Sequence, residues 1–170
     1  MTARQPVRPQ QNPPRDSRSR DNRTRDDQSG SISKQIIEEI SELNNLQGYN
    51  IRTLVKHAEE FGPFLRNRRL ETNQIRKFLD AINRLKAQLT QGDANESAPK
   101  DDVALFAEIE TDIVLLKPKL AYAAARQEAA KPLSEVMSVA IDRVHNLKDF
   151  ERLVQLVESI IAYHKAEGGR

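Results

Sequence analysis

Apolar residues recur at spacings of three and four along the chain from about residue 33 to its end, which is the repeat of an amphipathic helix. No stretch alternates apolar and polar positions as a convincing strand would. The pattern predicts an all-α fold, a compact bundle of five to six amphipathic helices that forms a single domain over residues 32–170. Within it, residues 91–100 hold Gly92 and Pro99 and are expected to form a polar linker.

The most clearly marked helix lies within Arg66–Leu89. Thr72 is its expected N-cap, because the side-chain oxygen can accept hydrogen bonds from the first turn. At about 100° per residue, Lys77 and Arg84 fall nearly opposite the apolar side. The apolar positions are Ile75, Phe78, Leu79, Ile82, Leu85 and Leu89.

Two helices are expected before this one. Ser33 is the predicted N-cap of the first, which should end at Gly48. Asn50 is the predicted N-cap of the second, and Gly62 and Pro63 should stop it before a short separate turn of helix.

The second half of the chain predicts further helices. Asp101 and Asp102 are expected at a helix N-terminus, where negative charge is favourable, and Pro118 should kink or restart that helix. Pro132 suits the first turn of the next helix, and the last should begin at about Lys148. The inward positions expected after Asp102 are Val103, Phe106, Ile109, Ile113, Leu116 and Leu120.

Residues 1–31 have a different composition, rich in Pro, Gln, Ser and Arg, with seven Arg against four Asp. Such a segment buries too little apolar surface to offset its ordering entropy, so we predict a disordered Arg/Pro-rich tail. An Arg-rich tail can add sequence-independent affinity for RNA, or it can act as a solubilising extension.

The formal net charge of +2 hides an uneven distribution. Residues 32–170 carry twenty basic and twenty-one acidic side chains, yet residues 66–86 carry seven basic side chains against two acidic ones. This excludes a generally basic coat and favours one local basic site.

The composition also excludes several kinds of chemistry. The chain contains no cysteine, which rules out disulfides, thiolate metal sites and cysteine nucleophiles. No segment approaches the roughly 18 apolar residues of a membrane span, so we expect a soluble, cytoplasmic protein.

No cofactor or metal motif is present: the chain has neither a glycine-rich phosphate loop nor a His-Glu-x-x-His pattern. His164 extends the apolar side of the last helix, so we interpret it as a packed histidine rather than a metal ligand or general base. Acidic pairs such as Glu38 with Glu42, and Glu108 with Asp112, are common on solvated helix faces. We therefore expect no cofactor, no metal site and no enzymatic activity.

Two basic clusters are the best candidates for a binding site. The first lies around the Arg66–Leu89 helix, and the second places Tyr122 between two cations at i, i+3 and i+7 of one helix face. Tyr122 fits a core position as well as it fits a stacking platform. With no recognition module in the chain, we expect phosphate contacts that do not read the base sequence. The predicted RNA-binding residues are Arg66, Arg68, Arg69, Arg76, Lys77, Arg84, Lys119, Tyr122 and Arg126.

Three segments in this order, ETNQIRKFLDAINRL, LLKPKLAYAAAR and VESIIAYHK, resemble the small helical subunit of type III-A CRISPR–Cas effector complexes, the Csm complex. The resemblance covers about Phe64 to Lys165. It implies an all-helical, non-catalytic subunit, present in several copies as a short filament. By position, Arg76, Lys77 and Arg126 are its best RNA contacts.

The partners that the resemblance implies are crRNA, target RNA and the other subunits of a CRISPR effector complex in antiviral defence. An alternative from another class is a helical protein–protein adaptor whose basic surface meets an acidic partner. Copurifying RNA would favour the first interpretation, and a stable protein partner without RNA would favour the second.

Overall fold

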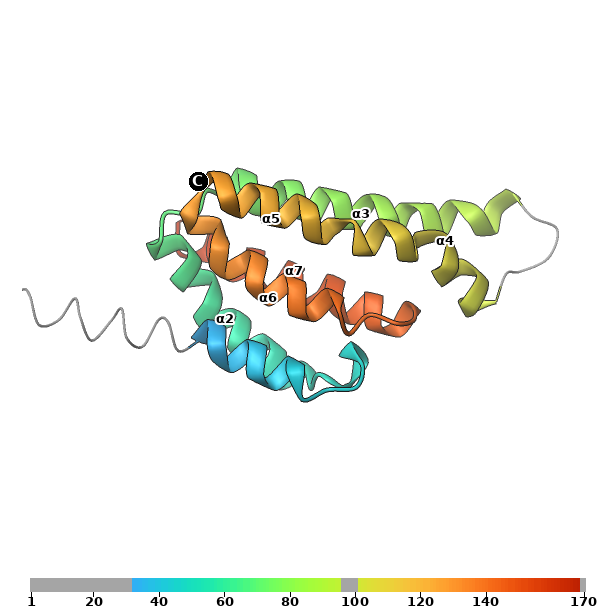
Figure 1. The fold of residues 1–170 in the computed structure, drawn as a ribbon, viewed down its shortest axis with the longest axis horizontal. Helices are drawn as coiled ribbons and strands as arrows, with labels where there is room; N and C mark the ends of the chain where they lie inside the picture. Colours follow the sequence, from blue (N-terminus) through green and yellow to red (C-terminus); the bar gives the residue numbers. More distant parts are fainter. Residues whose placement is uncertain (1–31, 96–100, 169–170) are drawn as a thin grey trace, which may run out of the picture.

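The computed structural model describes residues 32–95 and 101–168, and every regular element in these two ranges is helical (Figure 1). The predicted all-α class is therefore confirmed. Residues 1–31, where the disordered tail was expected, lie outside the described residues. A helix covers residues 32–41, and the elements after it are η1 (Leu46–Gly48), α2 (Ile51–Asn67), α3 (Thr72–Asn95), α4 (Asp102–Val114), α5 (Leu116–Arg126), η2 (Glu128–Ala130), α6 (Lys131–Ile141) and α7 (Leu147–Ala166).

Helix α7 is the centre of the bundle and contacts η1, α2, α3 and α4. In Figure 1, α3 and α5 run along the upper edge, α2 and the helix over residues 32–41 run along the lower edge, and α6 and α7 lie between them. Helix α5 packs mainly on α6. None of the described helices is long and apolar enough to cross a membrane. The buried residues of α7 are Asp149, Phe150, Leu153, Val154, Leu156, Val157, Ile160, Ile161 and His164.

Helices α2 and α7 approach each other closely at Gly62. A Cβ atom at this position would lie 2.6 Å from the backbone nitrogen of His164 and 2.8 Å from the Cβ of Tyr163. Real side chains do not tolerate such distances to backbone, so only glycine fits here. Gly62 thus sets the spacing between the two helices.

The predicted helix stop at Gly62 and Pro63 is wrong, because α2 continues through both residues to Asn67. A proline inside a helix costs about 3 kcal/mol. Continuing the helix buries Phe64 and Leu65 on the same side as Phe61, and each such side chain contributes about 1.5–3 kcal/mol. Tertiary packing therefore outweighs the local penalty.

The predicted N-cap at Asn50 and the predicted helix N-terminus at Asp101 are confirmed. The side chain of Asn50 accepts hydrogen bonds from the amides of Arg52 and Thr53 at 2.9 and 3.3 Å, at the start of α2. The side chain of Asp101 accepts one from the amide of Ala104 at 2.7 Å, at the start of α4. In both places the cap precedes the first helical residue and is exposed to solvent, so local chemistry decides the boundary.

Two other predicted caps are wrong. Ser33 lies inside a helix that already includes residue 32, and Thr72 is the first helical residue of α3 rather than its cap. Both hydroxyls are buried and have no hydrogen-bond partner among the described residues. Ile32 and Leu70 are also buried, so packing outweighs the local capping preference of Ser33 and Thr72.

A buried carboxylate ties η1 to the turn before α7. Asp149 is fully buried, and its two oxygens accept hydrogen bonds from the amides of Gln47 at 2.7 Å and His145 at 3.0 Å. Nearby, Nη2 of Arg143 donates to the carbonyl oxygen of Ser41 at 2.7 Å. The segment before α2 is therefore fastened to the C-terminal part of the chain by charge-assisted hydrogen bonds.

The predicted restart at Pro118 is confirmed, because α4 ends at Val114 and α5 begins at Leu116. The predicted inward position of Val103 is wrong: this side chain is 78% exposed, and Leu105 is buried instead. At about 100° per residue, Val103 lies roughly a quarter turn away from the centre of the buried stripe of α4.

Helix α3 is longer than predicted and runs through Gly92 to Asn95. The first half of the stretch expected as a linker is therefore helical. Residues 96–100 lie outside the described part of the chain.

We predict that Gly62→Ala lowers the free energy of unfolding by about 3 kcal/mol, because the methyl group must push α2 and α7 apart. Urea unfolding of the full-length chain measures the change. The matched control is Gly48→Ala, whose new methyl group would meet nothing closer than 3.6 Å and should change stability by less than about 0.5 kcal/mol. Equal losses in the two variants would contradict the close approach of α2 and α7.

Candidate nucleic-acid interface

A groove with a volume of about 680 Å³ runs between α3 and α5. It forms because α3 packs mainly on α7 and α4, whereas α5 packs mainly on α6, so that the two helices face each other with limited direct contact. Both basic clusters predicted from the sequence contribute to it. The lining residues are Gln74, Lys77, Phe78, Ala81, Leu116, Lys119, Leu120, Tyr122, Ala123, Arg126 and Gln127.

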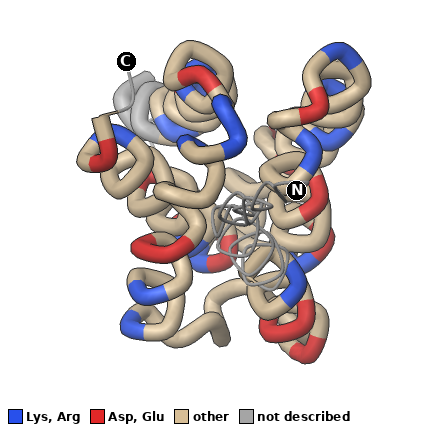
Figure 2. Tube along the Cα trace, turned by 90° about the vertical axis from the view of Figure 1, so that its left-hand side faces the viewer, with Lys and Arg blue, Asp and Glu red and all other residues tan. Residues whose placement is uncertain are grey.

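The charge of this groove is positive. Among the described residues that line it, Lys77, Lys119 and Arg126 are cationic and none is acidic. In the end-on view of Figure 2, Lys and Arg positions lie on both upper arms of the bundle, which are α3 and α5. Two walls that carry the same charge create a potential that attracts anions.

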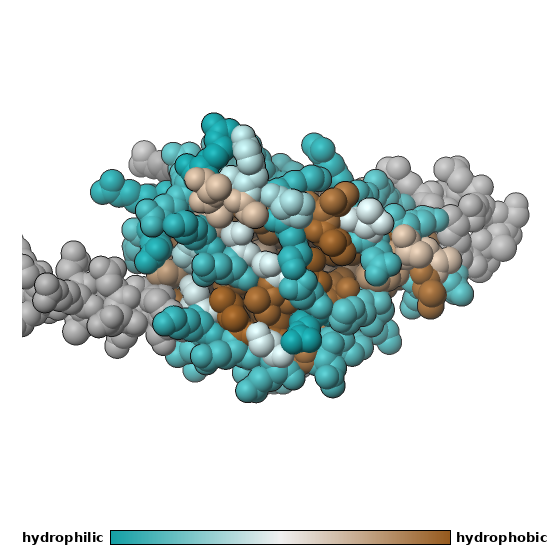
Figure 3. Space-filling view, viewed as in Figure 1, coloured by the Kyte–Doolittle hydropathy of each residue, from teal (hydrophilic) through white to brown (hydrophobic). Residues whose placement is uncertain are grey.

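The surface also carries exposed apolar side chains away from the groove. Val103, Val114 and Leu115 are 78%, 53% and 46% exposed, and Val103 and Val114 share one face of α4 at eleven residues' spacing. Figure 3 shows apolar surface among hydrophilic side chains on the face that carries α5 and α6. Val103 and Val114 are about three helical turns apart, so they are separate exposed apolar positions on one face of α4.

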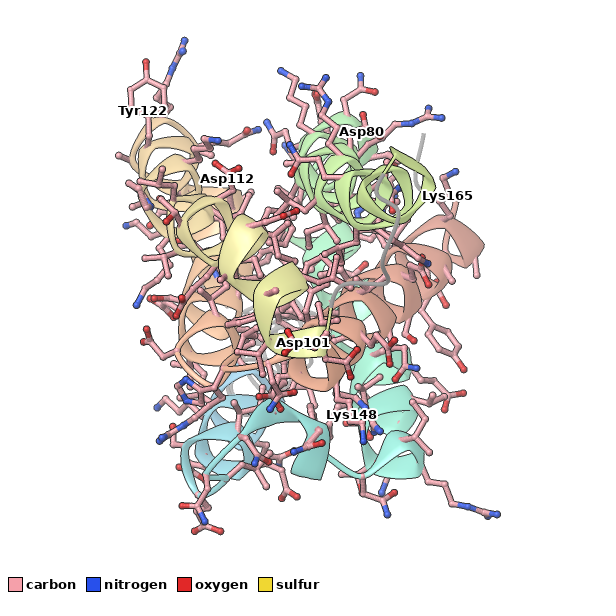
Figure 4. All side chains as sticks on the ribbon, turned by 90° about the vertical axis from the view of Figure 1, so that its right-hand side faces the viewer. Asp80, Asp101, Asp112, Tyr122, Lys148 and Lys165 are labelled. Atoms are coloured by element: carbon pink, nitrogen blue, oxygen red, sulfur yellow. The ribbon has the colours of Figure 1, made fainter. Side chains whose placement is uncertain are left out.

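Tyr122 is on the rim of the groove and not in the core. Its side chain is 65% exposed, and Figure 4 shows it at the outer edge of α5, pointing away from the body of the protein. The guanidinium of Arg126 lies 5.7 Å from the centre of the tyrosine ring, and Nη1 of Arg126 is 3.4 Å from the tyrosine hydroxyl. The structure thus removes the core interpretation of Tyr122 and leaves an exposed ring paired with a cation.

The other predicted cations lie outside the groove. Arg76 and Arg84 are exposed on α3 but do not line it. Arg66, Arg68 and Arg69 lie at the end of α2 and in the turn that leads to α3. The predicted RNA-binding residues therefore divide into those that line the groove and those that lie on the surface outside it.

In the turn between α2 and α3, a non-glycine residue, Arg69, adopts a left-handed backbone conformation. Arg69 has φ of 64°, in the left-handed region that normally favours glycine. The amide of Leu70 binds the carbonyl oxygen of Leu65, and the amide of Arg69 binds that of Arg66, at 3.0 and 2.9 Å, which is a Schellman motif. The guanidinium of Arg68 lies 5.2 Å from the centre of the Phe64 ring.

His164 forms a hydrogen bond to this turn from the protein interior. It is 1% exposed, and its Nε2 lies 2.9 Å from the carbonyl oxygen of Leu70, which requires Nε2 to carry the proton and donate. Its Nδ1 is buried and has no partner among the described residues. Burial lowers the pKa of His164; the hydrogen bond to Leu70 opposes this shift, and the positive charge of Arg66 adds to it. The predicted packed histidine is confirmed.

A second histidine lies near acidic residues of the helix over residues 32–41. Nδ1 of His57 is 2.6 Å from the hydroxyl of Tyr49, and burial lowers the pKa of His57 while the carboxylate of Glu39 opposes the shift. Burial, with a smaller effect of Glu39, raises the pKa of Tyr49 far above its usual value. Within the described residues, no group of three or more His, Asp and Glu side chains is arranged to hold a metal ion.

The apolar floor and the polar wall of the groove were not predictable from the sequence. Phe78, Leu116 and Leu120 were predicted as core residues, and they are buried, but they also line the groove. Gln74 was not singled out, although it lines the groove and its Oε1 is buried without a hydrogen-bond partner among the described residues. No sequence signal separates a core residue from one that forms the floor of a groove.

A family model described as Csm2 Type III-A matches residues 48–170, which is more than two thirds of the chain. The matched region contains both walls of the groove and the turn after α2. Comparisons with curated proteins and with solved structures gave no match.

We predict that Arg69→Gly raises the free energy of unfolding by about 1 kcal/mol, because glycine adopts the left-handed conformation without steric penalty. Urea unfolding again provides the measurement. Arg68→Gly is the control, since Arg68 has φ of −78° and stacks on Phe64, so this variant should lose stability. A loss of stability in Arg69→Gly would contradict the assigned conformation.

We predict that the protein loses stability as the pH falls below the usual histidine pKa of about 6.5. The lowered pKa of His164 means that the unfolded chain takes up a proton that the folded chain resists, so this stability is present above pH 6.5 and is lost as the pH decreases. Thermal unfolding at pH 7.5 and 5.5 measures the loss. His164→Gln keeps a hydrogen-bond donor for the carbonyl oxygen of Leu70 and should lose less stability between pH 7.5 and 5.5. The loss that remains in this variant includes the contribution of His57, whose pKa is also lowered. The same pH dependence in wild type and variant would exclude His164 as its source.

Proposed function

The chain belongs to the type III-A Csm2 family and is a small subunit of a type III-A CRISPR–Cas effector complex, and from this premise we propose that it holds RNA by its sugar-phosphate backbone. We further propose that it performs no catalytic step and that it supports assembly of the complex. In this function the backbones of crRNA and target RNA are contacted without regard to base sequence.

The observation that carries the proposal is the convergence of cations from two distant segments. Lys77 of α3 lines one wall of the groove, and Lys119 and Arg126 of α5 line the other, although more than forty residues separate Lys77 from either of them in the chain. Phosphate contacts require only exposed cations at a fixed separation, and two rigid helices provide that.

The remaining cations extend this surface. Arg76 and Arg84 lie on the exposed side of α3. The turn between α2 and α3 adds a further cluster of arginines just before the N-terminus of α3. We propose that these side chains contact the backbone on either side of the groove. The residues of that cluster are Arg66, Arg68 and Arg69.

A single groove of this kind binds weakly. If the three cations of the groove each neutralise one phosphate of a single strand, the logarithm of the affinity falls with the logarithm of salt concentration with a slope of about −2. Several copies on one RNA strand bind far more tightly than one copy. We therefore propose self-association in a short filament, with the exposed Val103 and Val114 of α4 as contact residues.

The proposed RNA site predicts a large effect of charge reversal in the groove. Lys77→Glu with Lys119→Glu should lower affinity for single-stranded RNA by roughly 50- to 100-fold at 50 mM salt and reduce the salt slope from about −2 to about −0.7. Fluorescence anisotropy of a labelled RNA, measured with the full-length chain at several salt concentrations, gives both quantities. Circular dichroism checks that the variant stays helical.

The matched control is Lys56→Glu with Lys148→Glu, which makes the same charge change at two exposed lysines outside the groove. It should change the affinity much less than the groove variant. Equal effects of the two double variants would show that only the net charge matters. Unchanged RNA affinity in the groove variant, together with loss of a protein partner, would favour the adaptor function instead.

A further inference from the structure

The groove between α3 and α5 is deeper and more apolar than phosphate contacts require. Lysines and arginines on an exposed helix face can reach a phosphate without any cavity. Here, however, Phe78, Leu116 and Leu120 form an apolar floor below the cations, and each of them is at most 8% exposed. The cavity of about 680 Å³ lies within the range of small-ligand sites.

The floor and the rim together define the chemistry of the occupant. An apolar floor favours a flat or hydrophobic group, the cationic rim favours an anion, and the exposed ring of Tyr122 favours a partner that stacks. A nucleotide has all three properties in one unit. We propose that this groove receives an unpaired nucleobase from a single-stranded segment of RNA, an inference that rests on the RNA-binding function proposed above.

Tyr122 and Arg126 form the stacking edge of the groove. They are one helical turn apart on α5, and the guanidinium lies 5.7 Å from the ring centre, so each holds the other at the rim. A base stacked on an aromatic side chain of this kind contributes roughly 5- to 150-fold in affinity. Lys77, on the opposite wall, and Lys119 neutralise the phosphates on either side of the base.

Gln74 supplies a polar group for the edge of the base. Its side chain lines the groove, and its Oε1 has no hydrogen-bond partner among the described residues. A buried acceptor without a partner is unfavourable, and rotation of the amide toward a base in the groove would pair it. Because an amide both donates and accepts, it can pair with different bases, in keeping with binding that is not sequence-specific.

The same geometry separates single-stranded from double-stranded RNA. In a duplex the bases are stacked and paired, and the helix presents its backbone and the edges of its grooves. A duplex can therefore reach the cations at the rim but cannot fill the apolar floor. An acidic peptide could also form ion pairs with the cations at the rim. Its carboxylates, however, offer no planar ring to stack on Tyr122, and they are not joined to such a ring at a fixed distance as the phosphate of a nucleotide is.

The experiment fills the groove without changing its charge. Ala123 lines the groove and is exposed, so Ala123→Phe occupies the space of the base, whereas Ala121→Phe makes the same substitution on α5 outside the groove and is the control. Three RNAs of about twelve nucleotides are compared by anisotropy with the full-length chain: a single strand, the same strand with its bases removed, and a duplex. Thermal unfolding confirms that each variant is folded.

We expect the wild-type chain to bind the intact single strand about tenfold more tightly than the abasic strand. Ala123→Phe should lower affinity for the intact strand about tenfold and leave the abasic strand and the duplex unchanged, and Ala121→Phe should change none of them. Tyr122→Leu should act like Ala123→Phe, whereas Tyr122→Phe should keep the affinity because it keeps the ring.

Equal binding of intact and abasic strands, or an equal loss for single strand and duplex in Ala123→Phe, would overturn the proposal. So would a glutamate-rich peptide that competes equally well with the intact and the abasic strand, since that result assigns the groove to a protein partner. The RNA-binding function fails separately, when Lys77→Glu with Lys119→Glu leaves duplex affinity unchanged. If intact and abasic strands bind equally well, and charge reversal in the groove still lowers duplex affinity, only the proposed base site is rejected.

Discussion

The close crossing of α2 and α7 at Gly62 is the constraint on which the rest of the structure depends. Because no Cβ separates the helices there, His164 of α7 comes near enough to reach the carbonyl oxygen of Leu70. That contact supports the turn at Arg69, and the turn sets where α3 starts and which of its faces is buried. The position of the α3 wall of the groove thus follows from a contact between two other helices.

Much of the fold could be predicted from local sequence, and the errors share one cause. Asn50 and Asp101 mark helix starts as expected, because both are exposed and accept hydrogen bonds from neighbouring amides. Thr72 fails as a cap, and Pro63 fails as a stop, because burial against other helices outweighs local preferences of about 1–3 kcal/mol. The α2–α7 crossing is invisible in a single sequence, since the approach of two distant helices leaves no periodic signal.

The candidate site was predictable in its charges but not in its shape. Lys77, Lys119 and Arg126 are predictable from charge and helical spacing, and the groove brings them together. The same signals do not separate them from Arg76 and Arg84, because the direction of an exposed side chain relative to another helix depends on packing. For the same reason the role of Tyr122 stayed open until the structure showed it exposed on the rim.

The carboxylate of Asp149 has a consequence for where the folding unit begins. The family match starts at residue 48, yet Asp149 binds the amide of Gln47. A chain shortened to the family boundary would leave a buried carboxylate oxygen without its donor and would uncover the surfaces that now bury Ile36 and Ile40. Such a fragment would be prone to aggregate, because the residues matched by the family model do not include all those that complete the packing around Asp149.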